Sequence, residues 1–179
     1  MALSKITNGG VAASGVPSGG IIQVQHTQFT GTNTVAISAE TDTPLTDLTV
    51  NITPISTTSI IYLQAHIFCE HGEDDTNTYN HVFFFYRDTT KLGHATAGSR
   101  LTGISMATRT HYLEDDDFTP EIARYDYFDT PSSTSQITYK CGLRTRIAED
   151  LTINRNISDT DANYTERGIS FISATEIAG

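Results

Sequence analysis

The sequence predicts an all-β protein, an antiparallel, jelly-roll-like β-sandwich. The chain of 179 residues contains 29 Thr and 14 Ser, and Thr is a β-branched residue that favours exposed strands over helices. Only 18% of the residues are charged, which is few for the solvent-facing sides of long helices. Apolar and polar residues alternate through most of the chain, and this period indicates roughly ten strands. We expect these strands to form one domain over residues 21–179.

Charge and hydropathy disfavour two classes of partner. The formal net charge is −10, with 21 acidic and 11 basic residues, so the chain lacks the basic footprint by which proteins bind nucleic acid. The longest apolar run, residues 82–86, is far too short to cross a bilayer. The N-terminus also lacks the apolar core of a signal peptide. We therefore expect no nucleic acid partner, no membrane insertion and assembly in the cytoplasm.

Residues 1–20 differ in composition from the rest of the chain. This segment is rich in glycine and small residues, and no strand or helix period runs through it. Such a segment does not bury a core by itself. We expect it to attach the domain to a larger assembly, and the alternative is an unstructured leader.

Three strands are predicted at the start of the domain, over residues 21–29, 34–38 and 48–52. The third alternates most regularly, with Leu48, Val50 and Ile52 on one face. Turns are expected around residues 31–33 and 44–47, where Gly, Asn, Pro and Asp gather.

The next two strands, residues 59–69 and 79–88, are apolar or aromatic on both faces. One face of residues 59–69 carries only apolar side chains, from Ile61 to Cys69, and belongs in the core. An antiparallel sheet usually exposes a polar outer face, so the second apolar face predicts a subunit interface. The interface residues expected on this basis are Tyr62, His66, Phe68, Val82, Phe84 and Tyr86. The alternative is that a loop or the N-terminal segment of the same chain covers them.

The second half of the chain continues the strand pattern. Strands are predicted over residues 91–95, 104–108, 125–129, 135–145, 151–155 and 168–177. In residues 135–145 the side chains of Ile137, Tyr139, Cys141 and Leu143 are expected to point inward. The last strand is expected to lie between strands formed earlier, with Ile169, Phe171 and Ile177 facing the core.

No residue pattern in the chain predicts catalysis, and we expect neither an enzyme nor a bound cofactor or metal. The motifs of hydrolase nucleophiles, phosphate-binding loops and zinc proteases are absent from the sequence. The histidines at positions 26, 66, 71, 81, 94 and 111 have no zinc-ligand spacing. His66 and His81 lie on adjacent predicted strands, where packed, hydrogen-bonded side chains are expected; the alternative is an ion held by His66 copies at a trimer axis.

Two acidic stretches, residues 70–75 and 114–117, lack the ligand positions of an EF-hand. We interpret both as solvated loops, with an irregular calcium site as the alternative. Cys69 and Cys141 lie on apolar strand faces, which predicts two buried thiols. A disulfide between them is the alternative.

Several short segments, taken in order, are similar to a known family. They begin with residues 20–24, 48–54 and 59–63 and continue with Phe85-Tyr86-Arg87-Asp88, Thr138-Tyr139-Lys140, Ile153-Asn154-Arg155, Arg167-Gly168-Ile169-Ser170 and Thr175-Glu176-Ile177. Their order and spacing resemble virion structural proteins of tailed bacteriophages, of the type associated with marine phages. The similarity extends from about Gly20 to the end of the chain.

The resemblance implies a small β-sandwich in a fibre, knob, tail appendage or head decoration of a virion, commonly as a homotrimer. It implies contacts of residues 1–20 with other virion proteins and contact with a host surface polysaccharide. The alternative is a decoration or cement protein that stabilises the capsid or tail without binding the host. The family pattern contains no catalytic residues, and this chain departs from it in Cys69, Cys141 and its longer acidic loops.

Overall fold

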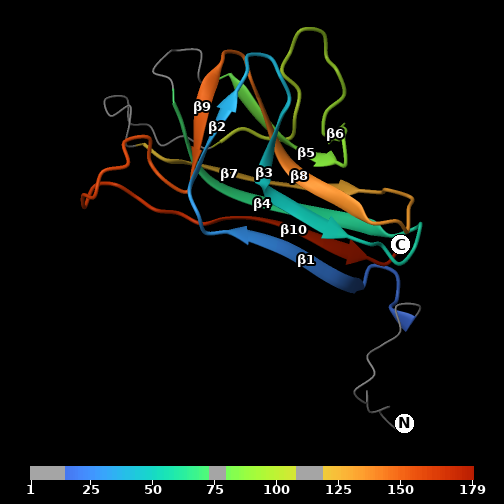
Figure 1. Cartoon of the computed structure of the whole chain (residues 1–179). Helices are drawn as coiled ribbons and strands as arrows, with labels where there is room; N and C mark the ends of the chain where they lie inside the picture. Colours follow the sequence, from blue (N-terminus) through green and yellow to red (C-terminus); the bar gives the residue numbers. More distant parts are fainter. Residues whose placement is uncertain (1–14, 73–79, 108–118) are drawn as a thin grey trace.

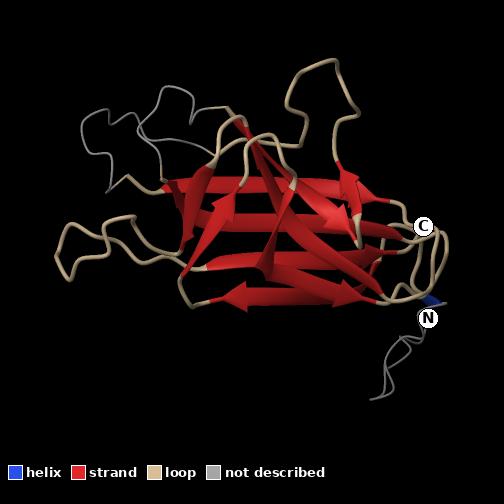
Figure 2. Ribbon diagram, turned by 45° about the horizontal axis from the view of Figure 1, so that its top comes forward, coloured by secondary structure: helices blue, strands red, loops and turns tan. Residues whose placement is uncertain are grey.

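The computed structural model describes residues 15–72, 80–107 and 119–179, and folds them into two antiparallel sheets (Figure 1). The larger sheet has the order β1-β10-β4-β9-β2, with β7 paired to the other edge of β4, and the smaller has the order β3-β8-β5-β6. Strands make up the body of the domain in Figure 2, and loops project from its ends. The strands are β1 (Ile21–Phe29), β2 (Asn33–Ile37), β3 (Thr43–Ile52), β4 (Ile60–His71), β5 (His81–Arg87), β6 (Thr90–Leu92), β7 (Glu121–Asp129), β8 (Ile137–Thr145), β9 (Glu149–Ile153) and β10 (Ser170–Ile177).

The strand pairing confirms the predicted jelly-roll-like sandwich. With β2 and β9 set aside, β1 pairs with β10, β3 with β8, β4 with β7 and β5 with β6. Each pair is nested inside the previous one along the chain, which is the connectivity of a jelly roll. The strand β10 lies between β1 and β4, as the sequence predicted.

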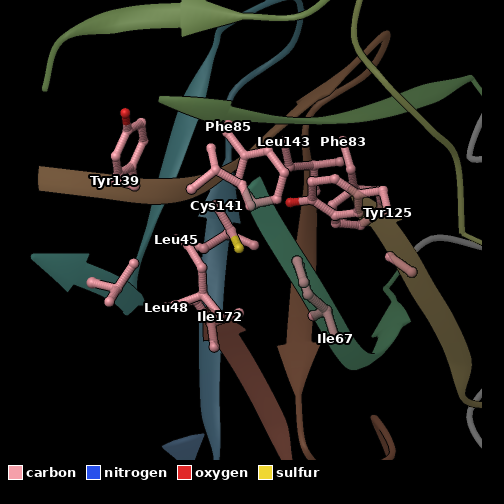
Figure 3. Close-up of a cluster of buried hydrophobic side chains, with 14 of the residues drawn as sticks. Leu45, Leu48, Ile67, Phe83, Phe85, Tyr125, Tyr139, Cys141, Leu143 and Ile172 are labelled. Carbon is pink, nitrogen blue, oxygen red and sulfur yellow. The ribbon is translucent and has the colours of Figure 1, made fainter. Parts of the chain in front are cut away.

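The core lies between the inward rows of the two sheets (Figure 3). Ile61, Leu63 and Ile67 of β4 are fully buried, and so are Cys141 and Leu143 of β8. The predicted inward rows of β3, β4 and β8 are therefore confirmed. Each buried aliphatic side chain contributes about 1.5–3 kcal/mol of transfer free energy, so these rows supply most of the driving force for folding.

A buried polar junction fills the place where β4 exchanges one neighbour for another. β4 pairs with β10 up to His66 and with β9 from Cys69 onward. Between them, the Phe68 amide donates to Ser170 Oγ (3.0 Å), and the Asn154 amide donates to the Phe68 carbonyl (2.8 Å). Ser170 Oγ in turn donates to Asn154 Oδ1 (2.6 Å). The backbone of β4 thus keeps its hydrogen bonds where the sheet divides.

The prediction for the inward side of β10 was wrong. Ile172, Ala174 and Glu176 point inward, whereas Ile169 is 47% exposed and Phe171 is half-buried. The reversal is explained by Glu176, whose carboxylate is buried but accepts hydrogen bonds from Ser59 Oγ (2.6 Å), the Ile55 amide (2.7 Å) and Gln23 Nε2 (2.6 Å). Three donors offset the loss of hydration, which a count of apolar residues along β10 does not reveal.

Three further expectations are corrected. Residues 104–107 form no strand and make only an isolated bridge between Ser105 and Phe83. β3 begins at Thr43, because a register irregularity between Leu45 and Thr49 lets the strand continue through the predicted turn. β7 begins at Glu121, four residues before the predicted start, because all nine of its residues pair with β4.

The predicted buried thiols are confirmed, since Cys69 and Cys141 are both free and fully buried. Burial raises the pKa of the Cys69 thiol well above its usual value and that of Cys141 to about 12. Of residues 1–20, only 15–20 are described; there the Gly19 amide donates to the Ala178 carbonyl (2.7 Å) beside the end of β10. The role of residues 1–20 stays a prediction.

We predict that Glu176→Gln destabilises the domain by about 1–3 kcal/mol, because an amide accepts fewer hydrogen bonds than the carboxylate and leaves a buried donor unpaired. Urea unfolding of the purified chain measures the change. Glu40→Gln, at an exposed position, is the matched control and should unfold like the wild type. An unchanged unfolding midpoint for Glu176→Gln would show that the three hydrogen bonds add nothing to stability.

Candidate functional site

The outer face of the large sheet carries several exposed large apolar side chains among polar ones. On β4 and β7 the outward side chains alternate with the buried ones, so that Phe128 lies beside Tyr62 and Ile122 beside Phe68. Phe128 is 62% exposed, Ile122 42% and Val24 of β1 53%. We call the outward side chains of β1, β10, β4 and β7 the outer face. Its members include Val24, Tyr62, Gln64, His66, Phe68, Ile122, Arg124, Asp126, Phe128 and Phe171, together with the polar Ser173 and Thr175 of β10.

Two aromatic rings form a platform at one end of the outer face. Tyr62 and Phe128 stack with ring centroids 4.5 Å apart. The Tyr62 hydroxyl donates to Asp126 Oδ2 (2.6 Å), and this hydrogen bond raises the pKa of Tyr62. The platform is therefore held in a defined orientation before anything binds, which reduces the entropy lost on binding.

His66 lies near the middle of the outer face as an uncharged ring. It stacks on Phe171 of β10 with centroids 5.6 Å apart. Burial, and after it the nearby charge of Arg124, lowers the pKa of His66 below its usual 6.5. The ring is thus neutral at pH 7 and fits an apolar contact without the cost of burying a charge.

A shallow hollow of about 480 Å³ opens between β4, β7 and β10 on the same face. Its rim carries Gln64, Arg124, Asp126 and the Phe171 ring. An amide, a guanidinium and a carboxylate beside an aromatic ring can donate to and accept from hydroxyl groups while an apolar ring face stacks. The hollow therefore has the chemistry to hold a polar, hydroxyl-rich ligand.

The predicted interface residues on β5 lie elsewhere. Because β5 belongs to the small sheet, the outward side chains Val82, Phe84 and Tyr86 do not adjoin Tyr62, His66 and Phe68. The expected single surface of six residues is therefore not present within one chain. Tyr62, His66 and Phe68 remain partly exposed on the outer face.

The chain itself covers much of β5, as the alternative interpretation anticipated. Phe84 is fully buried: Lys91 Nζ lies 4.0 Å from the centre of its ring, Tyr86 packs edge-on, and Gly142 leaves room for it. A Cβ at Gly142 would lie 2.5 Å from the Phe84 ring. A Cβ at Gly103, in the segment 93–107, would lie 2.9 Å from Val82 Cβ. Phe84 is therefore internal, while Val82 and Tyr86 are half-buried.

Only part of the expected acidic loops lies among the described residues. Glu70 and His71 were assigned to a solvated acidic loop, but both belong to β4 and are buried. The rest of that loop, residues 73–75, and the whole of residues 114–117 lie outside the described part of the chain. His81 stacks on His71 rather than facing His66. Glu70, His71 and His81 do not belong to the outer face.

No family model matches the chain, and no curated protein matches it either. Among the described residues, no helix is long and apolar enough to span a membrane. The evidence for function is therefore the geometry of the outer face and the resemblance in sequence to phage virion proteins.

Proposed function

We propose that the chain is a non-enzymatic virion structural protein of a tailed bacteriophage, which assembles as a homotrimer through the outer face of its large sheet. The observation that carries the proposal is the set of exposed large apolar side chains on this face, namely Val24, Ile122 and above all Phe128 at 62% exposure. The resemblance to phage virion proteins supplies the setting and the trimer.

An open apolar face of this kind favours a subunit contact. The outer layer of an antiparallel sheet is usually polar, and a contiguous apolar patch on a soluble protein typically marks an interaction site. Aromatic residues such as Tyr62 and Phe128 are the types enriched at the centre of interfaces. Arg124 and Asp126 are exposed on the same face, so a second copy offers opposite charges to both and sets the register.

Residues 1–20 are the second proposed contact region, for other proteins of the virion. This segment leads into β1 next to the end of β10, and we propose that it contacts other virion proteins. Jelly rolls are frequent in viral capsid proteins and lectins. The fold supports but does not decide the proposal, because one fold serves many functions.

We predict that the wild-type chain sediments at about three times its monomer mass of 19.5 kDa. The double substitution Tyr62→Ser and Phe128→Ser removes the stacked platform and should shift the chain to monomer, with at least a tenfold weaker association. Sedimentation equilibrium measures both.

Met106→Ser is the matched control, because Met106 is 50% exposed but lies outside the outer face. A monomeric wild-type chain would refute the interface, and so would a trimer that the double substitution leaves intact.

Binding of a host surface polysaccharide is a second candidate function, which uses the same face in place of the subunit contact, and the hollow beside Phe171 favours it. Sugar rings stack on aromatic faces, while their hydroxyls need donors and acceptors of the kind that Gln64, Arg124 and Asp126 provide. Several weak sites on one particle add up through multivalency.

We predict that, if the hollow binds glycans, Asp126→Ala abolishes retention on a bacterial polysaccharide array, because this carboxylate accepts from sugar hydroxyls and orients Tyr62. Arg146 lies in the connection between β8 and β9 and does not line the hollow. The control substitution Arg146→Ala should therefore leave retention unchanged. Equal retention of Asp126→Ala and wild type, or no retention of the wild type on any glycan, would remove this candidate.

A further inference from the structure

A cluster of imidazoles and carboxylates lies inside the sandwich, at the end remote from the outer-face platform. His71 ends β4, His81 begins β5 and Glu121 begins β7. All three side chains are at most 5% exposed, and one ligand-type atom from each lies within 4.8 Å of the others. The cluster therefore joins the large sheet, through β4 and β7, to the small sheet, through β5.

Glu149 of β9 orients the first of these rings. Its Oε1 lies 2.9 Å from His71 Nδ1, and a carboxylate at this distance accepts a hydrogen bond from the ring N–H. With Nδ1 protonated, a neutral ring presents the lone pair of Nε2 to the Glu121 carboxylate, 3.7 Å away. A histidine whose other nitrogen donates to a carboxylate is the usual arrangement of metal-ligating imidazoles.

The ring of His81 also has a nitrogen lone pair. The Ala107 amide donates to His81 Nε2 (3.1 Å), so that nitrogen carries a lone pair. The two rings stack with centroids 4.2 Å apart and planes inclined by 23°, a contact that two charged imidazolium rings would oppose. Two imidazoles and a carboxylate thus converge on one buried point.

We propose that His71, His81 and Glu121 bind one Zn²⁺ ion, which cross-links the two sheets. Two His and one Glu form a recognised zinc ligand set, and the fourth position takes a water molecule. Zinc bonds of about 2.0–2.2 Å separate tetrahedral ligand atoms by about 3.3 Å, so the side chains draw together slightly. Zinc at His81 Nε2 displaces the Ala107 amide, and residues 105–107 are the segment that has to adjust.

The site is independent of the outer face and of the proposed function. The cluster points into the core, whereas the outer face lies on the opposite side of β4 and β7. A zinc-free protein can therefore still be a trimer, and a monomeric protein can still bind zinc.

The test is calorimetric titration of ZnCl₂ into the full chain after treatment with EDTA and dialysis. We expect one equivalent of zinc bound and a thermal unfolding midpoint raised by zinc but not by MgCl₂. Glu121→Gln keeps the size of the side chain and removes its charge; it should weaken binding at least tenfold and abolish the zinc-dependent shift.

His94→Gln is the matched control, because His94 is an exposed histidine that is not among the three ligands, and it should bind as the wild type does. If Glu121→Gln does not fold, the visible absorption of Co²⁺ bound to the wild type reports whether the ligands are nitrogen and oxygen in a tetrahedral site. Absence of zinc binding by the wild type would overturn the proposal and favour a protonated His71 held between Glu121 and Glu149. Unchanged binding by Glu121→Gln, or loss of binding in His94→Gln, would overturn it as well.

Discussion

Pairing of β4 with three strands is the constraint on which the rest of the structure depends. β4 has β7 along one edge and β10, then β9, along the other. Its inward row builds the core, and its outward row builds the outer face. Because side chains alternate strictly along a strand, a shift of one residue would exchange the two rows and expose the core. The buried Asn154–Ser170 junction holds that register at the point where the sheet divides.

Polar groups join the two sheets at both ends of the facing strands β5 and β7. At one end Asp129 of β7 accepts from Arg87 of β5 (3.0 Å) and from the Tyr139 hydroxyl of β8 (2.7 Å). At the other end Glu121 and His81 approach each other beside His71. Apolar contacts between the two sheets do little to fix the orientation of one sheet relative to the other, because the hydrophobic effect is non-directional. Directional contacts at both ends oppose sliding of one sheet over the other.

The sequence predicted the fold class, the inward rows of β3, β4 and β8, and the central place of β10, because alternation is a local signal. It assigned the wrong side of β10 to the core, because the buried Glu176 accepts hydrogen bonds from two distant segments, β1 and the loop between β3 and β4. It found Tyr62, His66 and Phe68 of the outer face but missed Phe128 and Ile122, since their strand was expected to be shorter and its pairing with β4 is not visible in one sequence. The cluster of His71, His81 and Glu121 escaped for the same reason: ligands on three strands have no fixed spacing.

We propose that the outer face is buried between copies of the chain, and hydroxyl-radical footprinting across a protein dilution series measures this burial residue by residue. We expect the modification of Phe128 and Ile122 to slow as the concentration passes through the association range, while the modification of Met106, also exposed in the single chain, stays constant. Modification of Phe128 at one unchanged rate from the most dilute to the most concentrated sample would show that the outer face stays open to solvent.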